Sequence, residues 1–510
     1  MNPIIALMAK ERILFQSGGT VRKNKDGGAY TLGDACLYRN SMYRRGPVLY
    51  CIGRVGTQKD LFLASHTAFT SAFTGVMTHE NDIHLQTVRM TFENSLVLRK
   101  LFPFTAPISL RTKRTTIGCG DRLGLATPGQ LAAIRNFDAY PVLAQQSIRE
   151  LTLTKRTYRD VTAAAAFLVF QSGYERGYGA DGDHLKTLAD IDTALAAGMP
   201  MITLDLTNTM NPDAVSWNAS RIGNEFDKLP DAERARIMKT YAGRMFAVPG
   251  EKIFITETEA KRCALMYGKA ISFSKEVNDH IKAKRGNRYD LEISIDETTA
   301  PTLPEHHLFI IRELRRQKVL VNSLAPRFIG EFQKAIDYIG DAAEFDRQFR
   351  MHSAIAKANG NYKISVHSGS DKFAVYPSVG KYTGGRLHLK TAGTSWLEAV
   401  RTIAAKAPSL YRILHAKAFA YAPEALKLYH ITADFRKIPD IAGKSDTDLR
   451  SYLDMNESRQ LIHITYGGLL NDPAVRDEFF SALALYEEAH YGFLAAHFTK
   501  HLTLLGVRKR

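Results

Sequence analysis

Six short segments of this chain combine histidine, acidic and basic residues in a way that suits metal-assisted chemistry on a carbohydrate. They lie at residues 118–122, 179–186, 296–297, 325–327, 367–372 and 388–390, and each closes or follows a run that favours a β-strand. Imidazole and carboxylate groups bind divalent cations, and a bound cation polarises a carbonyl or an alkoxide. The segments therefore predict a site at which sugar oxygens meet a metal ion.

Four of these residues are predicted to bind the ion, which we expect to be Zn²⁺, Mn²⁺ or Ni²⁺: His184, Glu297, His367 and His388. Each stands at or just past the end of a different predicted strand, so that all four could point toward one axis. Asp183 and Asp296 are reserve ligands, and His463 is a further reserve. A lone His at a strand end is more often a hydrogen-bonded structural residue, and Asp296 could simply cap a helix. The prediction therefore rests on the set and not on any one member.

Arginines near the same strand ends predict that the site also binds an anion. Arg122, Arg149 and Arg327 each follow or close a predicted strand. The planar guanidinium group matches a carboxylate through two parallel hydrogen bonds. Arg327 is the strongest candidate because Pro326 makes its approach rigid. The competing interpretation of each arginine is a structural ion pair on the rim of the fold.

The elements that must hold these residues alternate between strand-like and helix-like patterns. The strand-like runs lie at 114–118, 166–171, 201–206, 291–296, 319–324, 362–367 and 386–391, with an eighth candidate at 461–466. Helical patterns such as 308–316 and 396–405 lie between them. Strands that alternate with helices form parallel βαβ units, and about eight such units predict an α/β fold with a closed (β/α)₈ barrel of the TIM type. In such a barrel the C-terminal ends of the strands form the active face.

We expect three parts along the chain. Residues 1–105 form a mixed α/β extension, residues 106–470 form the catalytic barrel, and residues 471–510 add C-terminal helices that pack on the barrel. Within the last part, the segment 473–501 is predicted to form one or two helices. The chemistry is therefore expected in the middle part.

The composition argues against several classes of protein. The chain has 510 residues, of which 45% are hydrophobic and 24% charged, as in an ordinary globular protein, so disorder and coiled coil are poor interpretations. No run approaches the roughly 18 apolar residues of a membrane span, and the start of the chain lacks the features of a signal peptide. The four cysteines form no CxxC pair, so we expect reduced thiols in a cytoplasmic protein.

The net charge of +16 raises the question of nucleic-acid binding. The Lys and Arg residues are spread along the whole chain, and the dense clusters at 282–285 and 312–318 have helical spacing and few aromatic residues. Solvated helix faces explain these clusters better, and a positive field would also steer a small anionic substrate toward a site. We therefore expect a small-molecule substrate and no nucleic-acid or membrane partner, and leave a homo-oligomer open.

One rival motif is a glycine-rich segment at 118–124. Its G-x-G-x-x-x-G spacing differs from the G-x-G-x-x-G fingerprint of dinucleotide-binding folds. Pro128 would also sit awkwardly in the helix that should follow, and Asp138 alone is weak support for a ribose contact. The chain has no G-x-x-x-x-G-K-[ST] segment for nucleotide phosphates and no G-x-S-x-G segment of an esterase. No nicotinamide cofactor is expected.

Six long blocks of sequence resemble the tagaturonate epimerase family: 120–129, 146–151, 179–187, 323–328, 367–373 and 388–395. The resemblance implies a barrel fold, a divalent metal ion, and the interconversion of tagaturonate and fructuronate, with related activity on the neutral ketoses tagatose and fructose. One departure is Gln130, where the family pattern has His. If that position contacts the substrate, the departure bears on which substrate this chain accepts.

The chemistry of such a reaction narrows its mechanism. The two hexulosonates differ at C4, whose hydrogen is β to both the C2 ketone and the C6 carboxylate, so neither group acidifies it. Oxidation at C4 would need a nicotinamide, whereas retro-aldol cleavage of the C3–C4 bond needs only a cation to stabilise the enediolate. We therefore hypothesise cleavage, followed by recondensation on the other face of the aldehyde.

The expected roles follow from this route. Asp183 or Glu150 removes the proton of the C4 hydroxyl. Lysines near the metal stabilise the developing negative charge, and the arginines hold the C6 carboxylate. The full predicted set comprises the catalytic residues Asp183, Glu150, Lys186, Lys390 and Asp371 and the substrate-binding residues Arg122, Arg149, Arg327, Lys372, Gln130 and Ser368.

Two other functions remain open at this point. A metal-dependent sugar isomerase or an aldolase on the same barrel would share the metal site, and the stereochemistry of its product would distinguish it. A non-catalytic carbohydrate- or nucleic-acid-binding protein is favoured only by the positive charge, and it predicts salt-dependent binding to polyanions without a metal. The polar residues at several strand ends argue against this second alternative.

Overall fold

The computed structural model describes residues 2–13, 28–298 and 300–510 of the chain. Among these residues, eight strands form a closed barrel in which every neighbouring pair is parallel, in the order β10-β11-β14-β15-β16-β17-β8-β9. The strands are β8 (Thr115–Gly118), β9 (Tyr140–Ser147), β10 (Gly179–Leu185), β11 (Met201–Asp205), β14 (Asp290–Ile295), β15 (Val321–Pro326), β16 (Lys363–Val366) and β17 (Leu387–Lys390). The predicted (β/α)₈ barrel is therefore confirmed.

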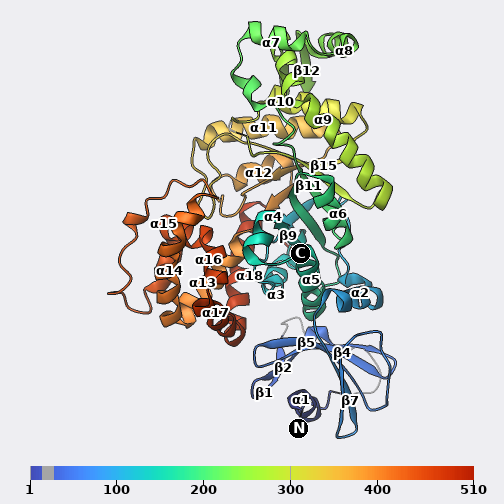
Figure 1. Cartoon of the computed structure of the whole chain (residues 1–510), viewed down its shortest axis with the longest axis vertical. Coiled ribbons are helices and arrows are strands. Elements are labelled where there is room, and N and C mark those ends of the chain that lie inside the picture. Colours follow the sequence, from blue (N-terminus) through green and yellow to red (C-terminus); the bar gives the residue numbers. More distant parts are fainter. Residues whose placement is uncertain (1, 14–27, 299) are drawn as a thin grey trace.

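Helices follow the strands and surround the barrel (Figure 1). They are α3 (Thr127–Ile134), α4 (Ile148–Thr154), α5 (Tyr158–Ser172), α6 (Leu188–Ala196), α10 (Pro304–Arg316), α11 (Ala342–Ala358), α12 (Tyr376–Thr383) and α13 (Thr394–Lys406). Local sequence sets their ends. In α5, Thr157 and Asp160 form a reciprocal capping box, and Gly173 ends the helix with a φ of 56°.

Two of the strand predictions are wrong because the apolar runs belong to buried helices. Residues 166–171 lie inside α5, and residues 461–466 span the end of α15 (Asn456–Ile464) and the start of α16 (Tyr466–Asn471). In α5, Phe167 and Phe170 are buried against aromatic residues of the N-terminal part. A helix that is covered on several sides lacks the polar face of an amphipathic helix, so its sequence resembles that of a buried strand.

Two real strands, β9 and β10, are missing from the predicted set because polar residues and glycines interrupt them. Gln145 and Gln146 are buried in β9, and Asp181 and Asp183 are buried in β10. These residue types are depleted in ordinary strands. Inside the barrel, Gln145 donates a hydrogen bond to Asp183, and Asp181 and Asp183 form ion pairs with Lys390, whereas the amide of Gln146 has no hydrogen-bond partner among the described residues.

A separate antiparallel sheet lies beside the barrel at the N-terminal end of the chain (Figure 1). Its strands are β1 (Ala29–Leu32), β2 (Ala35–Tyr38), β3 (Tyr43–Arg45), β4 (Val48–Val55), β5 (Gln58–Ser65), β6 (Val76–Glu80) and β7 (Ile83–Val88), and the helices nearby are α1 (Pro3–Lys10) and α2 (Phe92–Leu101). Residues 1 and 14–27 of the predicted extension lie outside the described residues. The boundary at residue 105 stays a prediction.

A long insertion between β11 and β14 was not anticipated. It contains α7 (Ala219–Phe226), α8 (Asp231–Tyr241), the antiparallel pair β12 (Arg244–Val248) and β13 (Glu251–Ile255), and α9 (Glu257–Arg285). In Figure 1 its α7, α8 and β12 project from the barrel at the end opposite the N-terminal sheet. Lys282 and Lys284 are exposed in the last turn of α9, where the helix dipole favours cations. Lys282 and Lys284 of the basic cluster therefore lie at a solvated helix end, whereas Arg285 is half-buried and donates a hydrogen bond to the carbonyl of Leu195 at 2.6 Å.

Helices alone follow the last barrel strand. They are α13, α14 (Pro408–Leu426), α15, α16, α17 (Pro473–Leu485) and α18 (Glu487–Leu504). The first five share a second apolar core around Trp396 and Tyr411, whereas Leu494, Phe498 and Leu502 of α18 belong to the core of the barrel. The expected helices at 473–501 are confirmed as α17 and α18, and α18 packs on α3 and α13. The boundary at residue 470 stays a prediction. All four cysteines are buried and free, and no helix in the described ranges is both long and apolar enough to cross a membrane.

Candidate active site

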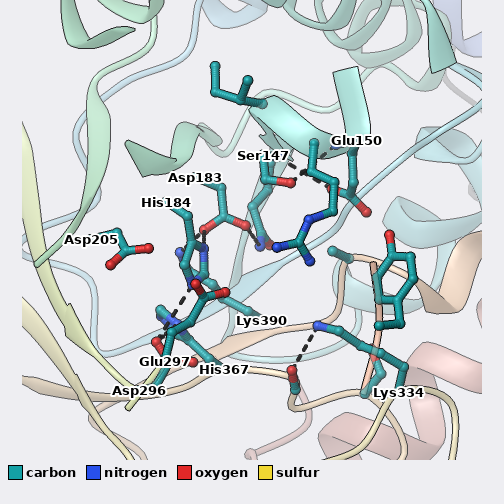
Figure 2. A pocket seen from close by; sticks show the side chains of 18 of the residues that line it. Ser147, Glu150, Asp183, His184, Asp205, Asp296, Glu297, Lys334, His367 and Lys390 are labelled. Atoms are coloured by element: carbon teal, nitrogen blue, oxygen red, sulfur yellow. Dashed lines mark hydrogen bonds and ion pairs between the residues drawn. The ribbon is translucent and has the colours of Figure 1, made fainter. Parts of the chain in front are cut away.

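A cavity of about 320 Å³ lies at the C-terminal ends of the barrel strands. Figure 2 shows acidic and basic side chains from several of these ends facing a common space. The strand ends contribute Gln145 and Ser147 (β9), Asp183 and His184 (β10), Asp205 (β11), Asp296 (after β14), His367 (after β16) and Lys390 (β17). The strands thus bring together residues that are more than 200 positions apart in the chain, as the barrel prediction requires.

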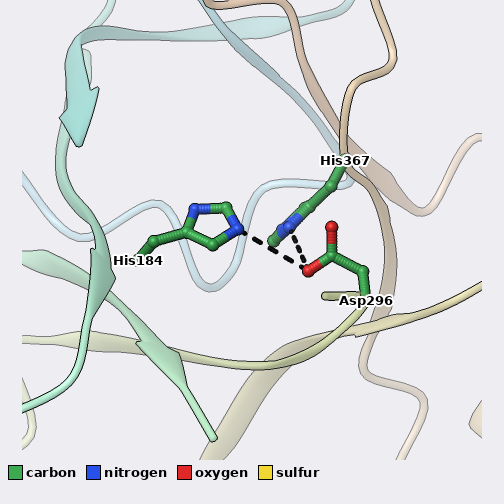
Figure 3. Close-up of side chains that lie close together, drawn as sticks. All are labelled: His184, Asp296 and His367. Atoms are coloured by element: carbon green, nitrogen blue, oxygen red, sulfur yellow. Dashed lines mark hydrogen bonds and ion pairs between the residues drawn. The ribbon is translucent and has the colours of Figure 1, made fainter. Parts of the chain in front are cut away.

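Three side chains that could hold a metal ion meet at one side of this cavity (Figure 3). Oδ1 of Asp296 lies 3.0 Å from Nδ1 of His367 and 3.6 Å from Nε2 of His184. The three donor atoms all lie within 4.8 Å of one another. Two of the four predicted ligands, His184 and His367, are therefore brought together, and the reserve ligand Asp296 joins them.

A bulge in β10 brings Asp183 and His184 to the same side of the barrel wall. Neighbouring residues of a regular strand point to opposite faces. Here the register with β11 shifts between Gly182 and Leu185, and His184 has a φ of 57°, which is unusual for a residue with a side chain. Both Asp183 and His184 consequently line the cavity.

A buried carboxylate supports each of the two histidines. Oδ1 of Asp183 lies 2.7 Å from Nδ1 of His184, and Oε1 of Glu292 lies 2.6 Å from Nε2 of His367. Each imidazole therefore has one nitrogen on a carboxylate and the other toward Asp296. Carboxylates placed in this way fix the orientation of metal-binding histidines and make them more basic. The donor set fits a divalent cation.

Lys390 neutralises part of the negative charge of the carboxylates that contact the two histidines. Its ammonium group lies 2.5 Å from Asp183, 2.9 Å from Asp181 and 2.9 Å from Glu292. Burial alone would lower the pKa of Lys390, but these carboxylates outweigh it and raise that pKa well above its usual range. With Asp296, four carboxylates surround one lysine and two histidines, and a divalent cation would offset the remaining negative charge.

The other two predicted ligands, Glu297 and His388, lie outside this cluster of three side chains. Glu297 is exposed and lines the cavity, but it is outside the cluster of three donor groups. His388 is buried inside the barrel and does not line the cavity, and its Nδ1 lies 3.0 Å from Oγ1 of Thr116. Burial lowers the pKa of His388 to about 3, so this imidazole is neutral. Its Nε2 has no hydrogen-bond partner among the described residues. Metal binding by Glu297 and His388 stays a prediction.

Glu150 and Lys334 lie on the opposite side of the cavity from His184, Asp296 and His367 (Figure 2). Oε1 of Glu150 accepts a hydrogen bond from Nε of Arg122 at 2.9 Å, and Nη2 of the same guanidinium completes the ion pair at 2.9 Å. The Arg122 guanidinium also lies 3.6 Å above the ring of Tyr466. Lys334 donates a hydrogen bond to Oγ of Ser368 at 2.8 Å. This side of the cavity is therefore built from α4 and from the loops after β8, β15 and β16.

The amino-acid sequence of this chain matches a known protein family over most of its length. Residues 38–505 match the tagaturonate epimerase family, UxaE. The chain belongs to this family. The tagaturonate/fructuronate epimerase of Thermotoga maritima is 41% identical over 413 residues, which cover 81% of this chain and 85% of that protein. The predicted family and the predicted class, an isomerase of the epimerase type, are thereby confirmed.

Solved structures of the tagaturonate epimerase family share the whole architecture. The native crystal structure of the fructuronate-tagaturonate epimerase from Cohnella laeviribosi has a TM-score of 0.89 and 42% identity, and covers 93% of this chain and 97% of that chain. A crystal structure of the same enzyme with one glycerol has a TM-score of 0.88 and 42% identity, and covers 92% and 96%. The N-terminal sheet and the C-terminal helices therefore belong largely to the shared fold.

In this member of the tagaturonate epimerase family, ten predicted site residues line the cavity: Arg122, Arg149, Glu150, Asp183, His184, Lys186, Glu297, His367, Ser368 and Lys390. Lys186 forms an ion pair of 3.2 Å with Asp205. Arg149 is exposed at the start of α4, and its guanidinium lies 5.5 Å from the ring of Tyr429. The roles assigned to these residues stay predictions.

The remaining predicted residues lie outside the main cavity. Arg327 lines a neighbouring cavity of about 270 Å³ and donates a hydrogen bond to the carbonyl of Thr298. Gln130 is fully buried, and its amide donates to Oγ of Ser395 at 2.8 Å. Asp371 and Lys372 are buried in the loop after β16. These four residues can act on the cavity only through their neighbours in this structure.

The glycines at 118–124 have a packing role. A Cβ atom on Gly118 would lie 1.8 Å from Oε1 of Gln145, and one on Gly120 would lie 2.5 Å from the backbone of Ala392. Close approach of neighbouring backbones and side chains thus requires glycine here. Pro128 lies in the first turn of α3, where proline is favoured, so the expectation that it would disturb the following helix is wrong.

Three charged residues at or near the cavity were not predicted from the sequence: Asp181, Glu292 and Lys334. Asp181 and Glu292 are fully buried inside β10 and β14, and Lys334 lies in a loop without strand or helix signal. A charged residue inside an apolar strand run, as Glu292 is, is the one signal that could have pointed to the first two, because buried carboxylates need partners. Lys334 carries no such signal.

Proposed function

We propose that this chain interconverts tagaturonate and fructuronate by epimerisation at C4. The observation that carries this proposal is the cavity in which His184, Asp296 and His367 meet at the active face of the barrel. It is supported by the tagaturonate/fructuronate epimerase named above, with which the chain aligns over most of its length. Activity on tagatose and fructose and a cytoplasmic location are finer expectations that these observations leave as predictions.

His184, Asp296 and His367 would hold the divalent cation, with Zn²⁺, Mn²⁺ and Ni²⁺ as the candidates. When bound, such an ion supplies Lewis-acid stabilisation of an oxyanion. Asp183 and Glu292 keep the two histidines in a binding orientation, and Lys390 neutralises these carboxylates. The proposal includes a metal ion because the donor groups lie close together and buried carboxylates hold the two histidines in orientation.

Glu150 is the better candidate for the residue that removes the proton of the C4 hydroxyl. Asp183 contacts His184, Lys390 and Gln145 through its two oxygens. Burial would raise the pKa of Asp183, but Lys390 and His184 hold it well below its usual range, which makes it a weak base. Glu150 binds Arg122 through Oε1, and the contact of its Oε2 with the backbone N–H of Ser147 is long, at 3.4 Å. We therefore assign Asp183 to orienting His184 and Glu150 to proton transfer.

The proposed route is retro-aldol cleavage of the C3–C4 bond followed by recondensation. The proton leaves the C4 hydroxyl, the C3–C4 electron pair moves to the ketone-bearing fragment as an enediolate, and C4 becomes an aldehyde carbon. The aldehyde then rotates, the electron pair of the enediolate reforms the C3–C4 bond on the other face, and the base returns the proton to the C4 oxygen, which gives the epimer. No proton is lost from C4 at any stage, because the C4 hydrogen stays on the aldehyde carbon.

Incubation of the purified protein with fructuronate in deuterated water tests both parts of the proposal. Nuclear magnetic resonance should show tagaturonate at equilibrium without deuterium at C4. Deuterium at C4 would exclude the retro-aldol route while leaving the epimerase activity intact. Net release of three-carbon fragments would point to an aldolase, an aldose product would point to a sugar isomerase, and a protein inert toward fructuronate would refute the proposed function.

A further inference from the structure

The cavity is lined by five lysine and arginine residues, which differ in whether a carboxylate already pairs with them. Lys390 contacts three carboxylates, Arg122 is paired with Glu150, and Lys186 is paired with Asp205. Arg149 and Lys334 have no ion pair with any residue that the structure describes. These two cations are thus available for an anion that the protein itself does not supply.

Lys334 is placed to offer hydrogen bonds into the cavity. An ammonium group has three donors, and among the residues that the structure describes only Oγ of Ser368, at 2.8 Å, accepts a hydrogen bond from Nζ. Burial lowers the pKa of Lys334, and the carboxylates around it only partly offset that effect. A half-buried cation in this situation gains from the arrival of an anionic partner.

Lys334 and Arg149 line the same region of the site. Both line the main cavity and the neighbouring one, together with Tyr429 and Ser368, so they lie where the two cavities meet. His463, which also lines the main cavity, is only 2% exposed, and neither of its ring nitrogens has a hydrogen-bond partner among the described residues. This unpartnered polar side chain indicates that a polar ligand group belongs beside Lys334.

Hydrogen bonds from a second lysine hold the loop that carries Lys334 in place. The buried ammonium group of Lys372 donates hydrogen bonds to the carbonyls of Gln333 at 2.8 Å, Ile336 at 2.6 Å and Ser370 at 3.0 Å. It thereby ties the loop after β15 to the loop after β16, which carries Ser368. Lys334 is consequently held in place before any ligand arrives, which reduces the entropy cost of binding.

We infer that Lys334, assisted by Arg149, binds the carboxylate of the substrate and thereby selects a sugar acid over the neutral sugar. The inference rests on the proposed function for the identity of that acid. It replaces Arg327 as the main carboxylate-binding residue, because Arg327 donates to the carbonyl of Thr298 and lines only the neighbouring cavity. A lysine at this place adds a charge-assisted hydrogen bond that a neutral ketose cannot use.

Two non-reacting probes test this inference, a six-carbon aldonate and the alditol of the same configuration, which differ only in the carboxylate. Their affinities are measured by calorimetry on the wild type, Lys334→Met and Lys334→Arg. We expect Lys334→Met to weaken aldonate binding by about 10- to 150-fold, as for the loss of a hydrogen bond to a charged group. Alditol binding should stay unchanged, and Lys334→Arg should recover most of the aldonate affinity. Lys357→Met, at an exposed lysine of α11, is the matched control.

The outcomes separate this inference from the proposed function. Aldonate binding that is unaffected in Lys334→Met, or aldonate and alditol binding weakened by the same factor, would overturn it. If the alditol binds too weakly to measure, the aldonate affinities of Lys334→Met and Lys334→Arg decide alone. A wild type that binds the aldonate through Lys334 but leaves fructuronate unchanged would refute the epimerase activity and support the carboxylate subsite.

Discussion

At the scale of single residues, the site is organised by pairs of opposite charge. His184 and His367 each contact a carboxylate, and the ammonium group of Lys390 neutralises part of the charge of those carboxylates. The sequence showed the histidines because they stand at strand ends, and it showed Asp183 because it precedes His184. It could not show that Glu292 pairs with His367, because the two residues are 75 positions apart and only the barrel brings them together.

The assignment of proton transfer to Glu150 predicts the behaviour of Glu150→Gln. This variant keeps the size of the side chain and its place in the capping box of α4 but removes the base. We expect kcat to fall by about 10²- to 10⁴-fold, the usual contribution of a general base, with a small change in KM. Steady-state kinetics with fructuronate measures both values.

Glu305→Gln, in the first turn of α10, is the control for Glu150→Gln, since Glu305 does not line the cavity. Circular dichroism should show that both variants are folded. A folded Glu150→Gln protein with the kcat of the wild type would show that another group takes the proton.

At the scale of strands and loops, the irregular segments carry the chemistry. The bulge in β10 turns His184 into the cavity, and the loop after β16 presents His367 and Ser368. The sequence predicts six of the eight strands closely because their buried runs are apolar. It fails at β10, where glycines and aspartates replace the β-branched residues that mark a strand. The polar residues that form the site in β10 are thus the same residues that obscure the strand pattern in its sequence.

The three hydrogen bonds of Lys372 predict that Lys372→Met loosens the loop of Lys334. The variant leaves three buried carbonyls without this donor and frees the loops after β15 and β16 to move apart. A displacement of about 1 Å in a binding group can cost about a hundredfold in rate, so we expect kcat/KM for fructuronate to fall by about that factor.

Lys381→Met changes an exposed lysine on the neighbouring helix α12 and should leave kcat/KM unchanged. Hydrogen exchange of residues 333–336 provides a second measurement, because a loosened loop exchanges faster. Unchanged exchange and unchanged kcat/KM in Lys372→Met would argue against the positioning role.

At the scale of the whole molecule, the C-terminal helices complete the site. His463 of α15 and Tyr429, which follows α14, line the cavity. Arg122 donates a hydrogen bond to the carbonyl of His463 at 3.4 Å and lies against Tyr466. The sequence placed one of these segments, 461–466, inside the barrel as a strand. The active site therefore depends on helices that lie outside the barrel proper.

Buried neutral histidines across the molecule predict a loss of stability in acid. Burial lowers the pKa of His352, His415 and His490 to about 4 each. In the unfolded chain these groups have pKa values of about 6.5, so between about pH 4 and pH 6.5 the unfolded state binds more protons. The free energy of unfolding therefore rises with pH in that window and falls as the pH drops below about 6.5.

His415→Leu isolates one of these groups, since His415 lies in α14 among Tyr411, Phe419 and Tyr452 and does not line the cavity. Urea denaturation at several pH values should show a slope smaller than that of the wild type by up to about 1.4 kcal/mol per pH unit. Equal slopes for the two proteins would mean that His415 is not neutral in the folded state.

The most direct test of the account is the epimerase activity of the protein after removal of its metal. The protein is dialysed against a chelator, its metal content is measured, and tagaturonate formation from fructuronate is followed before and after addition of Mn²⁺, Ni²⁺ or Zn²⁺. We predict that activity disappears with the ion and returns with one of the three, and that His184→Gln neither retains the ion nor recovers. A metal-free protein that still forms tagaturonate at the original rate would contradict the account.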